Sequence, residues 1–203
     1  MNSVKGTLVA LALGLYAGSA AAAVVNLTDI TGTWGPAQLT DGTNPTGVNT
    51  SHIQWGRPVT AGDYSGYKFD GTGNGSNLVA DQSFVFGTFT HENFPVYDAS
   101  LDWAQLNLTF KLSVDGTAHD LTASFRFDHT ETPNTGGNNC CNDLVEFVSS
   151  VNDFDTITID GITYTFQLDG FVSQNGNPVT FFSTEEGKAN TANLVGRFTQ
   201  VVD

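Results

Sequence analysis

Residues 106–127 read LNLTFKLSVDGTAHDLTASFRF, and this stretch decides the fold class. Apolar side chains occupy every second position on either side of Asp115-Gly116, with polar residues between them. Alternation with a period of two is typical of a strand that buries one face. Asp-Gly is a preferred two-residue turn of a β-hairpin. The stretch therefore predicts two antiparallel strands joined at Asp115-Gly116.

The position of the turn also predicts the register of the two strands, because cross-strand partners must lie symmetrically about it. The apolar face then pairs Phe110 with Leu121, Leu108 with Ala123, Leu106 with Phe125 and Ala104 with Phe127. The polar face pairs Lys111 with Asp120, Thr109 with Thr122 and Gln105 with Arg126. A slip of one residue would move every apolar side chain to the polar face.

The same pattern recurs along the chain and predicts an all-β fold. A second hairpin is expected at Asp160-Gly161, between Ile157-Thr158-Ile159 and residues 162–168. Residues 32–51 are interpreted as an N-terminal strand and loops. Further strands are predicted at residues 65–69, 83–90, 144–148, 179–183 and 194–202. Short strands separated by frequent turn signals favour an antiparallel β-sandwich, which we expect to be jelly-roll-like.

Residues 1–23 have the pattern of a cleaved secretory signal peptide. Lys5 precedes a short apolar run, Leu8 to Tyr16, and small residues follow as an Ala-x-Ala cleavage site. The run is too short to span about 30 Å of hydrocarbon, although an uncleaved anchor is the alternative. We therefore expect export, no membrane insertion of the mature chain, and a single β-sandwich domain over residues 24–203.

The charge balance of the chain limits its partners. Apart from Lys5, six Lys and Arg residues face 21 Asp and Glu residues. Such a surface repels phosphate backbones, so nucleic acid is not an expected partner. Cations are the natural counterparts of this charge. The alternative is that the charge only keeps an extracellular protein soluble.

No set of residues predicts an enzyme. His91-Glu92 lacks the second His of a zinc-protease motif, because Pro95 stands at its place. His91 is therefore expected to hydrogen-bond loop backbone, with metal binding as the lesser alternative. A Gly-x-Ser-x-Gly nucleophile elbow does not occur. A glycosidase pair among the carboxylates is a lesser alternative; its candidates are Glu92, Glu131, Glu146, Glu185 and Glu186.

The segment from His129 to Asp143 is dense in side-chain oxygens. Calcium takes six to eight oxygen ligands, so Glu131, Asn134, Asn138 and Asp143 are candidate Ca²⁺ ligands. The segment lacks the spacing of an EF-hand loop, and Asn and Gly also serve ordinary turns.

Two further features of the sequence are candidates for a functional role. Cys140 and Cys141 are adjacent, and in an oxidising compartment they would form a vicinal disulfide, stay free or bridge to another chain. Trp103, on the polar face of the first predicted hairpin, and Trp55 are candidate platforms for stacking on a sugar ring. The alternative for each is a core or rim tryptophan.

A set of short motifs resembles the THxN family of bacterial exported proteins, also described as choice-of-anchor K domain proteins. The most specific is Gly87-Thr88-Phe89-Thr90-His91-Glu92-Asn93, in which Thr90, His91 and Asn93 are the motif residues. The others are Ile53-Gln54-Trp55-Gly56, Ser65-Gly66-Tyr67-Lys68-Phe69, Glu131-Thr132-Pro133-Asn134, Gly170-Phe171 and Thr184-Glu185.

The resemblance implies a bacterial surface or extracellular protein, many of whose relatives carry a C-terminal Pro-Glu-Pro sorting tail. Residues 197–203 instead read as a last strand, so we expect no anchor of this kind. The leading hypothesis is a secreted, non-enzymatic protein with a structural or adhesive role, whose partner is an extracellular polysaccharide or another surface protein. The alternatives are a calcium-stabilised carbohydrate-binding module and a secreted glycan hydrolase.

Overall fold

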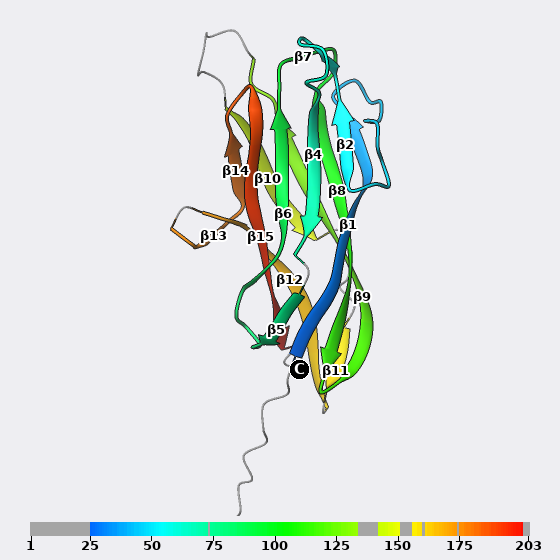
Figure 1. The fold of residues 1–203 in the computed structure, drawn as a ribbon, viewed down its shortest axis with the longest axis vertical. Coiled ribbons are helices and arrows are strands. Elements are labelled where there is room, and N and C mark those ends of the chain that lie inside the picture. The colour runs from blue at the N-terminus through cyan, green and yellow to red at the C-terminus, as the bar shows by residue number, and fades with distance from the viewer. Residues whose placement is uncertain are drawn as a thin grey trace, which may run out of the picture.

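The computed structural model describes residues 25–72, 74–133, 142–150, 156–159, 161–173 and 175–200. Within these ranges every regular element is a β-strand (Figure 1). The strands are β1 (Val25–Leu39), β2 (His52–Trp55), β3 (Arg57–Pro58), β4 (Ser65–Gly71), β5 (Asn74–Leu78), β6 (Phe84–Asn93), β7 (Val96–Tyr97), β8 (Leu101–Val114), β9 (Thr117–Thr130), β10 (Asp143–Ser150), β11 (Thr156–Ile159), β12 (Ile162–Val172), β13 (Pro178–Val179), β14 (Phe181–Thr184) and β15 (Lys188–Gln200). No helix in these ranges is long and apolar enough to cross a membrane.

Two antiparallel sheets pack against each other and form a β-sandwich. The first sheet has the strand order β14-β10-β9-β8-β1-β5, and the second has the order β11-β12-β15-β6-β4-β2, with β13 paired to β12. β3 and β7 form a small separate ladder. Every pair of neighbouring strands is antiparallel, so the predicted antiparallel β-sandwich is confirmed.

The hairpin formed by β8 and β9 has the predicted register at every pair. Phe110 lies opposite Leu121, Leu106 opposite Phe125, and the polar face carries the predicted partners as well. Asp115 and Gly116 have φ angles of 45° and 86°. Positive values at both central residues are those of a type I′ turn, whose twist matches that of the flanking strands.

Other strand boundaries differ from the prediction, and one difference places two residues of the candidate site within a strand. β6 continues to Asn93, three residues beyond its predicted end, so His91 and Asn93 lie within a strand. β1 begins at Val25 and pairs with β8 along most of its length. The strand predicted at residues 179–183 is divided between β13 and β14, which join different sheets.

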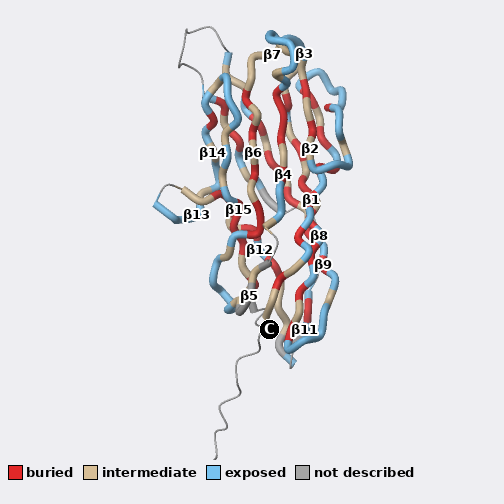
Figure 2. Tube along the Cα trace, in the orientation of Figure 1, coloured by how far each residue is buried: buried red, intermediate tan, exposed pale blue. Residues whose placement is uncertain are grey.

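Aromatic side chains make up much of the buried core between the sheets. Figure 2 marks the buried residues in red along strands of both sheets. Trp34 of β1 contacts Tyr67, Phe89 and Phe127, with ring centroids 5.3 to 5.9 Å apart. All four rings are fully buried and come from both sheets. Burial of aromatic rings in such tilted and edge-to-face contacts contributes strongly to the free energy of folding.

Gly87 of β6 tests this packing, because a Cβ atom there would overlap the buried ring of Phe69. Gly87→Ala should lower the free energy of unfolding by about 1 to 3 kcal/mol, since Phe69 has little room to move. Thr88→Ala, on the opposite face of the same strand, is the control and should cost less than about 1 kcal/mol. Denaturant unfolding measures both, and equal effects would contradict this account of the core.

Candidate functional site

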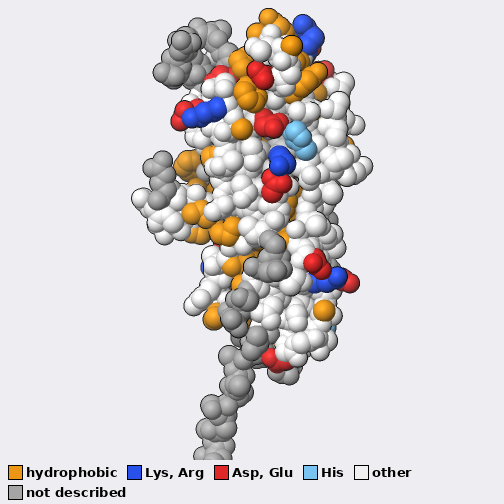
Figure 3. Space-filling view, in the orientation of Figure 1, with side chains coloured by type: hydrophobic (Ala, Val, Ile, Leu, Met, Phe, Trp, Pro, Cys, Tyr) orange, Lys and Arg blue, Asp and Glu red, His pale blue; other side chains and the backbone are white. Residues whose placement is uncertain are grey.

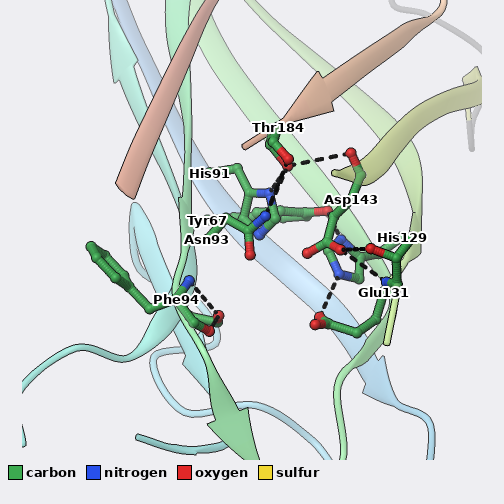
Figure 4. A network of polar contacts seen from close by, with 10 residues as sticks. Tyr67, His91, Asn93, Phe94, His129, Glu131, Asp143 and Thr184 are labelled. Carbon is green, nitrogen blue, oxygen red and sulfur yellow. Dashed lines mark hydrogen bonds and ion pairs between the residues drawn. The ribbon is translucent and has the colours of Figure 1, made fainter. Parts of the chain in front are cut away.

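Polar and ionisable side chains gather between the sheets at one place. We call this group the interior polar cluster; it comprises Tyr67, His91, Asn93, His129, Glu131, Asp143, Thr184 and Glu186. His91, Asn93, Asp143 and Thr184 have no exposed surface, and His129 is 7 % exposed. Figure 4 shows side chains from β4 and β6 of the second sheet meeting those from β9, β10 and β14 of the first.

Strand alternation places these side chains in the interior. His91 and Asn93 are two residues apart on β6 and share its buried face, and His91 lies directly opposite Tyr67 of β4. In the facing sheet, Asp143 lies opposite Thr184, while His129 continues the buried face of β9. Pairing and alternation thus bring together residues more than 90 positions apart in the sequence.

Hydrogen bonds within the cluster cross from one sheet to the other. The hydroxyl of Tyr67 lies 2.7 Å from His129 Nδ1, and His91 Nδ1 lies 2.8 Å from Thr184 Oγ1. Asn93 Nδ2 donates to the carbonyl oxygen of Thr184 at 3.3 Å. Buried hydrogen bonds of this kind are strengthened by the low dielectric of the interior, so they fix how the sheets face each other.

The protonation of His91 follows from its neighbours. The hydroxyl of Thr184 donates to the carbonyl oxygen of Asp143, so it accepts from His91 Nδ1–H. This assignment leaves His91 Nε2 with a free lone pair. Burial, together with the nearby His129, holds the pKa of His91 well below 6.5, which keeps the ring neutral.

Several buried atoms of the cluster have no hydrogen-bond partner within the described ranges. These atoms are His91 Nε2, Asn93 Oδ1, Asp143 Oδ2 and both carboxylate oxygens of Glu186. By contrast, Asp143 Oδ1 accepts from the backbone N–H and the hydroxyl of Thr132, at 2.9 and 3.1 Å. A buried acceptor without a partner costs about 1 to 3 kcal/mol, so these atoms offset part of the stability that the hydrogen bonds of the cluster contribute.

Three carboxylates lie close together at this place. Glu131, Asp143 and Glu186 each offer an oxygen within 4.8 Å of the others. Burial, with a contribution from the neighbouring carboxylates, raises the pKa of Glu186 from 4.5 to about 7. Burial likewise raises the pKa of Asp143 from 3.8 to about 6. Near neutral pH, burial and mutual repulsion of the carboxylates therefore favour the binding of a proton or a cation.

Trp55 belongs to this interior and not to the surface. Its indole is 3 % exposed, stacks on the ring of His91 at 5.9 Å and contacts Tyr67 and His129 edge-on. The prediction of Trp55 as a platform for a sugar ring is therefore wrong. The reason is the alternation of β2, which turns Ile53 and Trp55 together into the core.

The structure places Trp103 on the polar face of β8, as predicted. Its side chain is half-buried opposite Asp128, and its indole N–H donates to Gln38 at 3.2 Å. The guanidinium of Arg126 covers one face of the ring at 4.6 Å. A stacking partner would therefore meet the other face or displace Arg126.

Of the predicted calcium ligands, the structure brings Glu131 and Asp143 together. Asn134, Asn138, Cys140 and Cys141 lie outside the described residues. Of the motif residues, Thr90 lies on the outer, half-exposed face of β6, while His91 and Asn93 face inward. The expectation that His91 holds loop backbone is wrong, because β6 extends through it and its partner is the Thr184 hydroxyl.

Sequence reasoning missed His129, Tyr67 and Thr184 as members of a site and treated Glu186 only as one of several carboxylates. Period-two alternation could have assigned His129 to the buried face of its strand, two positions after Phe127. A neutral polar side chain in an otherwise apolar face signals a buried polar contact. No local signal identifies Thr184, since His91 lies on the other sheet and Asp143 on a neighbouring strand 41 residues away.

Comparisons with known proteins add no assignment. No protein-family model matches the chain, and no curated protein matches it.

The raised carboxyl pKa values predict an unusual pH dependence for the metal-free, chelator-treated protein. Between about pH 4 and pH 7 the folded chain keeps protons on Asp143 and Glu186 that the unfolded chain has lost. Stability therefore falls as the pH rises through this window. The lowered pKa of His91 acts in the opposite sense, and only as the pH falls through about 6.5, so the carboxyl effect is compared above that pH.

Thermal melts followed by circular dichroism in chelator should thus give a higher midpoint at pH 6.5 than at pH 8. Glu186→Gln should reduce the difference, because it removes one of the two titrating carboxyls. A midpoint that rises from pH 6.5 to pH 8 would contradict the burial of these groups.

Proposed function

We propose that the chain is an exported, non-enzymatic β-sandwich protein with a structural or adhesive role at the bacterial surface or in the exopolysaccharide matrix. Export rests on the signal-peptide pattern of residues 1–23. The partner is an extracellular polysaccharide or another surface protein. The resemblance of the Thr90-His91-Glu92-Asn93 motif to THxN proteins agrees with this compartment.

One observation carries the proposal: most residues of the interior polar cluster are enclosed between the sheets, and Glu131 and Glu186 are partly buried. His91, Asn93 and Asp143 have no exposed surface, so a polymeric substrate has no access to them. Their hydrogen bonds join the two sheets, which suits a stabilising role. A protein that persists outside the cell benefits from such cross-links, since it lacks the chaperones of the cytoplasm.

The close carboxylates do not favour a glycan hydrolase. A glycosidase places its two carboxyl groups about 5 to 10 Å apart on either side of a bound sugar. Here carboxylate oxygens of Glu131, Asp143 and Glu186 lie within 4.8 Å of one another, and Asp143 is fully buried. This close spacing and burial favour a shared proton or cation over a bound sugar ring.

A second candidate is the calcium-stabilised carbohydrate-binding module, which the surroundings of Trp103 favour. The indole lies on a sheet face beside the guanidinium of Arg126, the carboxylate of Asp128 and the amide of Gln38. An aromatic ring next to hydrogen-bonding side chains is a suitable surface for a sugar. In this candidate, Glu131 and Asp143 contribute to a Ca²⁺ site that stabilises the module.

A panel of insoluble and arrayed polysaccharides, read both for bound protein and for released sugar, tests these proposals. We expect binding without turnover, whether or not calcium is added. Loss of binding in Trp103→Ala, but not in Tyr97→Ala, would favour the carbohydrate-binding module. Tyr97 is the matched control, because Arg57 covers its half-exposed ring at 4.6 Å elsewhere on the surface. Turnover that Glu186→Gln abolishes would overturn the non-enzymatic role.

A further inference from the structure

Two sets of potential metal ligands meet at Asp143. In the first set, His91, His129 and Asp143 are all buried, and one ligand atom from each lies within 4.8 Å of the others. In the second set, Glu131 and Glu186 bring carboxylate oxygens within the same distance of Asp143. A metal ion moved into such a group needs only small side-chain adjustments to reach ligand distances of about 2.0 to 2.2 Å.

Every unpartnered atom of the cluster is a nitrogen or oxygen with a lone pair, and only a protonated carboxyl of Asp143 or Glu186 would carry a hydrogen to donate. His91 Nε2, Asn93 Oδ1, Asp143 Oδ2 and the two oxygens of Glu186 are all of this type within the described ranges. A single water donates only two hydrogens, so it leaves most of these atoms unsatisfied. A cation accepts electron pairs from several of them at once.

Basic side chains are not available to fill this role in the described part of the chain. Each of its six Lys and Arg residues already pairs with an Asp or Glu elsewhere, and Figure 3 shows several such mixed-charge groups on one face. These pairs are Arg57–Asp98, Lys68–Asp70, Lys111–Asp29, Arg126–Asp128, Lys188–Glu185 and Arg197–Asp169. Neutralisation of the buried carboxylates therefore falls to a proton or to a cation from solution.

The outer contacts of the cluster hold its ligands in the orientation that a metal site requires. Both imidazoles are held at Nδ1 by a hydroxyl, that of Thr184 for His91 and that of Tyr67 for His129. Asp143 is held at Oδ1 by Thr132, which leaves Oδ2 free. Hydrogen bonds to the second nitrogen or oxygen of a ligand are a regular feature of metal sites in proteins.

We propose that His91, His129 and Asp143 bind a divalent transition-metal ion of the zinc class, with a carboxylate from Glu131 or Glu186 as a further ligand. Two imidazole nitrogens and carboxylate oxygens form a donor set that suits Zn²⁺, whereas Ca²⁺ prefers oxygen ligands alone. This inference rests on the proposed stabilising role of the cluster and names the ion that completes it.

The experiment uses the purified mature protein, stripped with chelator and then titrated with Zn²⁺ or Ca²⁺ at pH 7.5. Calorimetry should show one Zn²⁺ per chain, and saturating Zn²⁺ should raise the melting temperature by several degrees. Ca²⁺ at the same concentration should do neither. Cobalt(II) in place of zinc should give visible absorption bands of nitrogen and oxygen ligands without thiolate charge-transfer absorption.

Asp143→Asn is the decisive variant, because it removes a ligand charge while keeping the oxygen that Thr132 contacts. It should weaken Zn²⁺ binding by more than the roughly 10- to 100-fold that loss of an outer contact costs. Without metal it should melt higher than the parent at pH 7.5, since it relieves repulsion from Glu131 and Glu186. A merely structural Asp143 would give lower melting instead.

Two controls exclude other sites for the ion. His52→Gln removes a surface His that lies 2.8 Å from Glu92 and should leave zinc affinity unchanged. Cys140→Ser combined with Cys141→Ser should also leave it unchanged. Zinc affinity that survives Asp143→Asn, or that is lost with the cysteines, would overturn the proposal. Preference for Ca²⁺ would overturn the choice of ion, and absence of any binding would overturn the site, while the question of glycan turnover is decided separately.

Discussion

The hydrogen bonds between hydroxyl groups and imidazoles across the sandwich are the interactions on which the site depends. Tyr67 and His91 belong to one sheet, His129 and Thr184 to the other, and each histidine is held from the opposite sheet. Hydrophobic contacts between the sheets are non-directional, so they allow sliding that these hydrogen bonds do not. The apolar core supplies most of the stability, and the polar contacts specify one alignment.

The interior polar cluster also contains acidic side chains that no Lys or Arg of the described ranges pairs with. The interior carboxylates of Asp143 and Glu186 have raised pKa values, and the positive side chains lie in surface pairs. A chain selected only for stability would replace these carboxylates with neutral side chains, because unpaired buried charge is costly. The proposed ion-binding role gives these carboxylates a purpose beyond folding.

How much could be predicted from the sequence depended on how local each constraint is. The register of β8 against β9 was predicted at every pair, because alternation and the Asp115-Gly116 turn act over a few residues. The end of β6 was predicted too early, since Thr90, His91 and Glu92 read as a polar loop until their inward and outward alternation is recognised. The pairing of β1 with β8 joins segments about 80 residues apart and has no local signal.

The candidate site also contains residues that local sequence could predict and residues that it could not. Glu131 and Asp143 were named correctly as neighbours, because the ends of adjacent strands bring them together. Thr184 ends β14 and Glu186 follows it by two residues, and β14 pairs with β10 only in the folded protein, so no sequence spacing relates them to His91. Trp55 was misplaced because a large indole was read as a surface platform, although Ile53 two residues earlier indicated a buried face.

The most direct test of the central claim is the stability of Thr184→Val, which is nearly isosteric and removes only the hydroxyl that His91 contacts. The account predicts a loss of about 1 to 3 kcal/mol in the free energy of unfolding, because buried polar partners lose their contact. Thr90→Val, on the outer face of β6, should change it by less than about 1 kcal/mol. Equal, small effects for the two variants would contradict a stabilising role for the interior polar cluster.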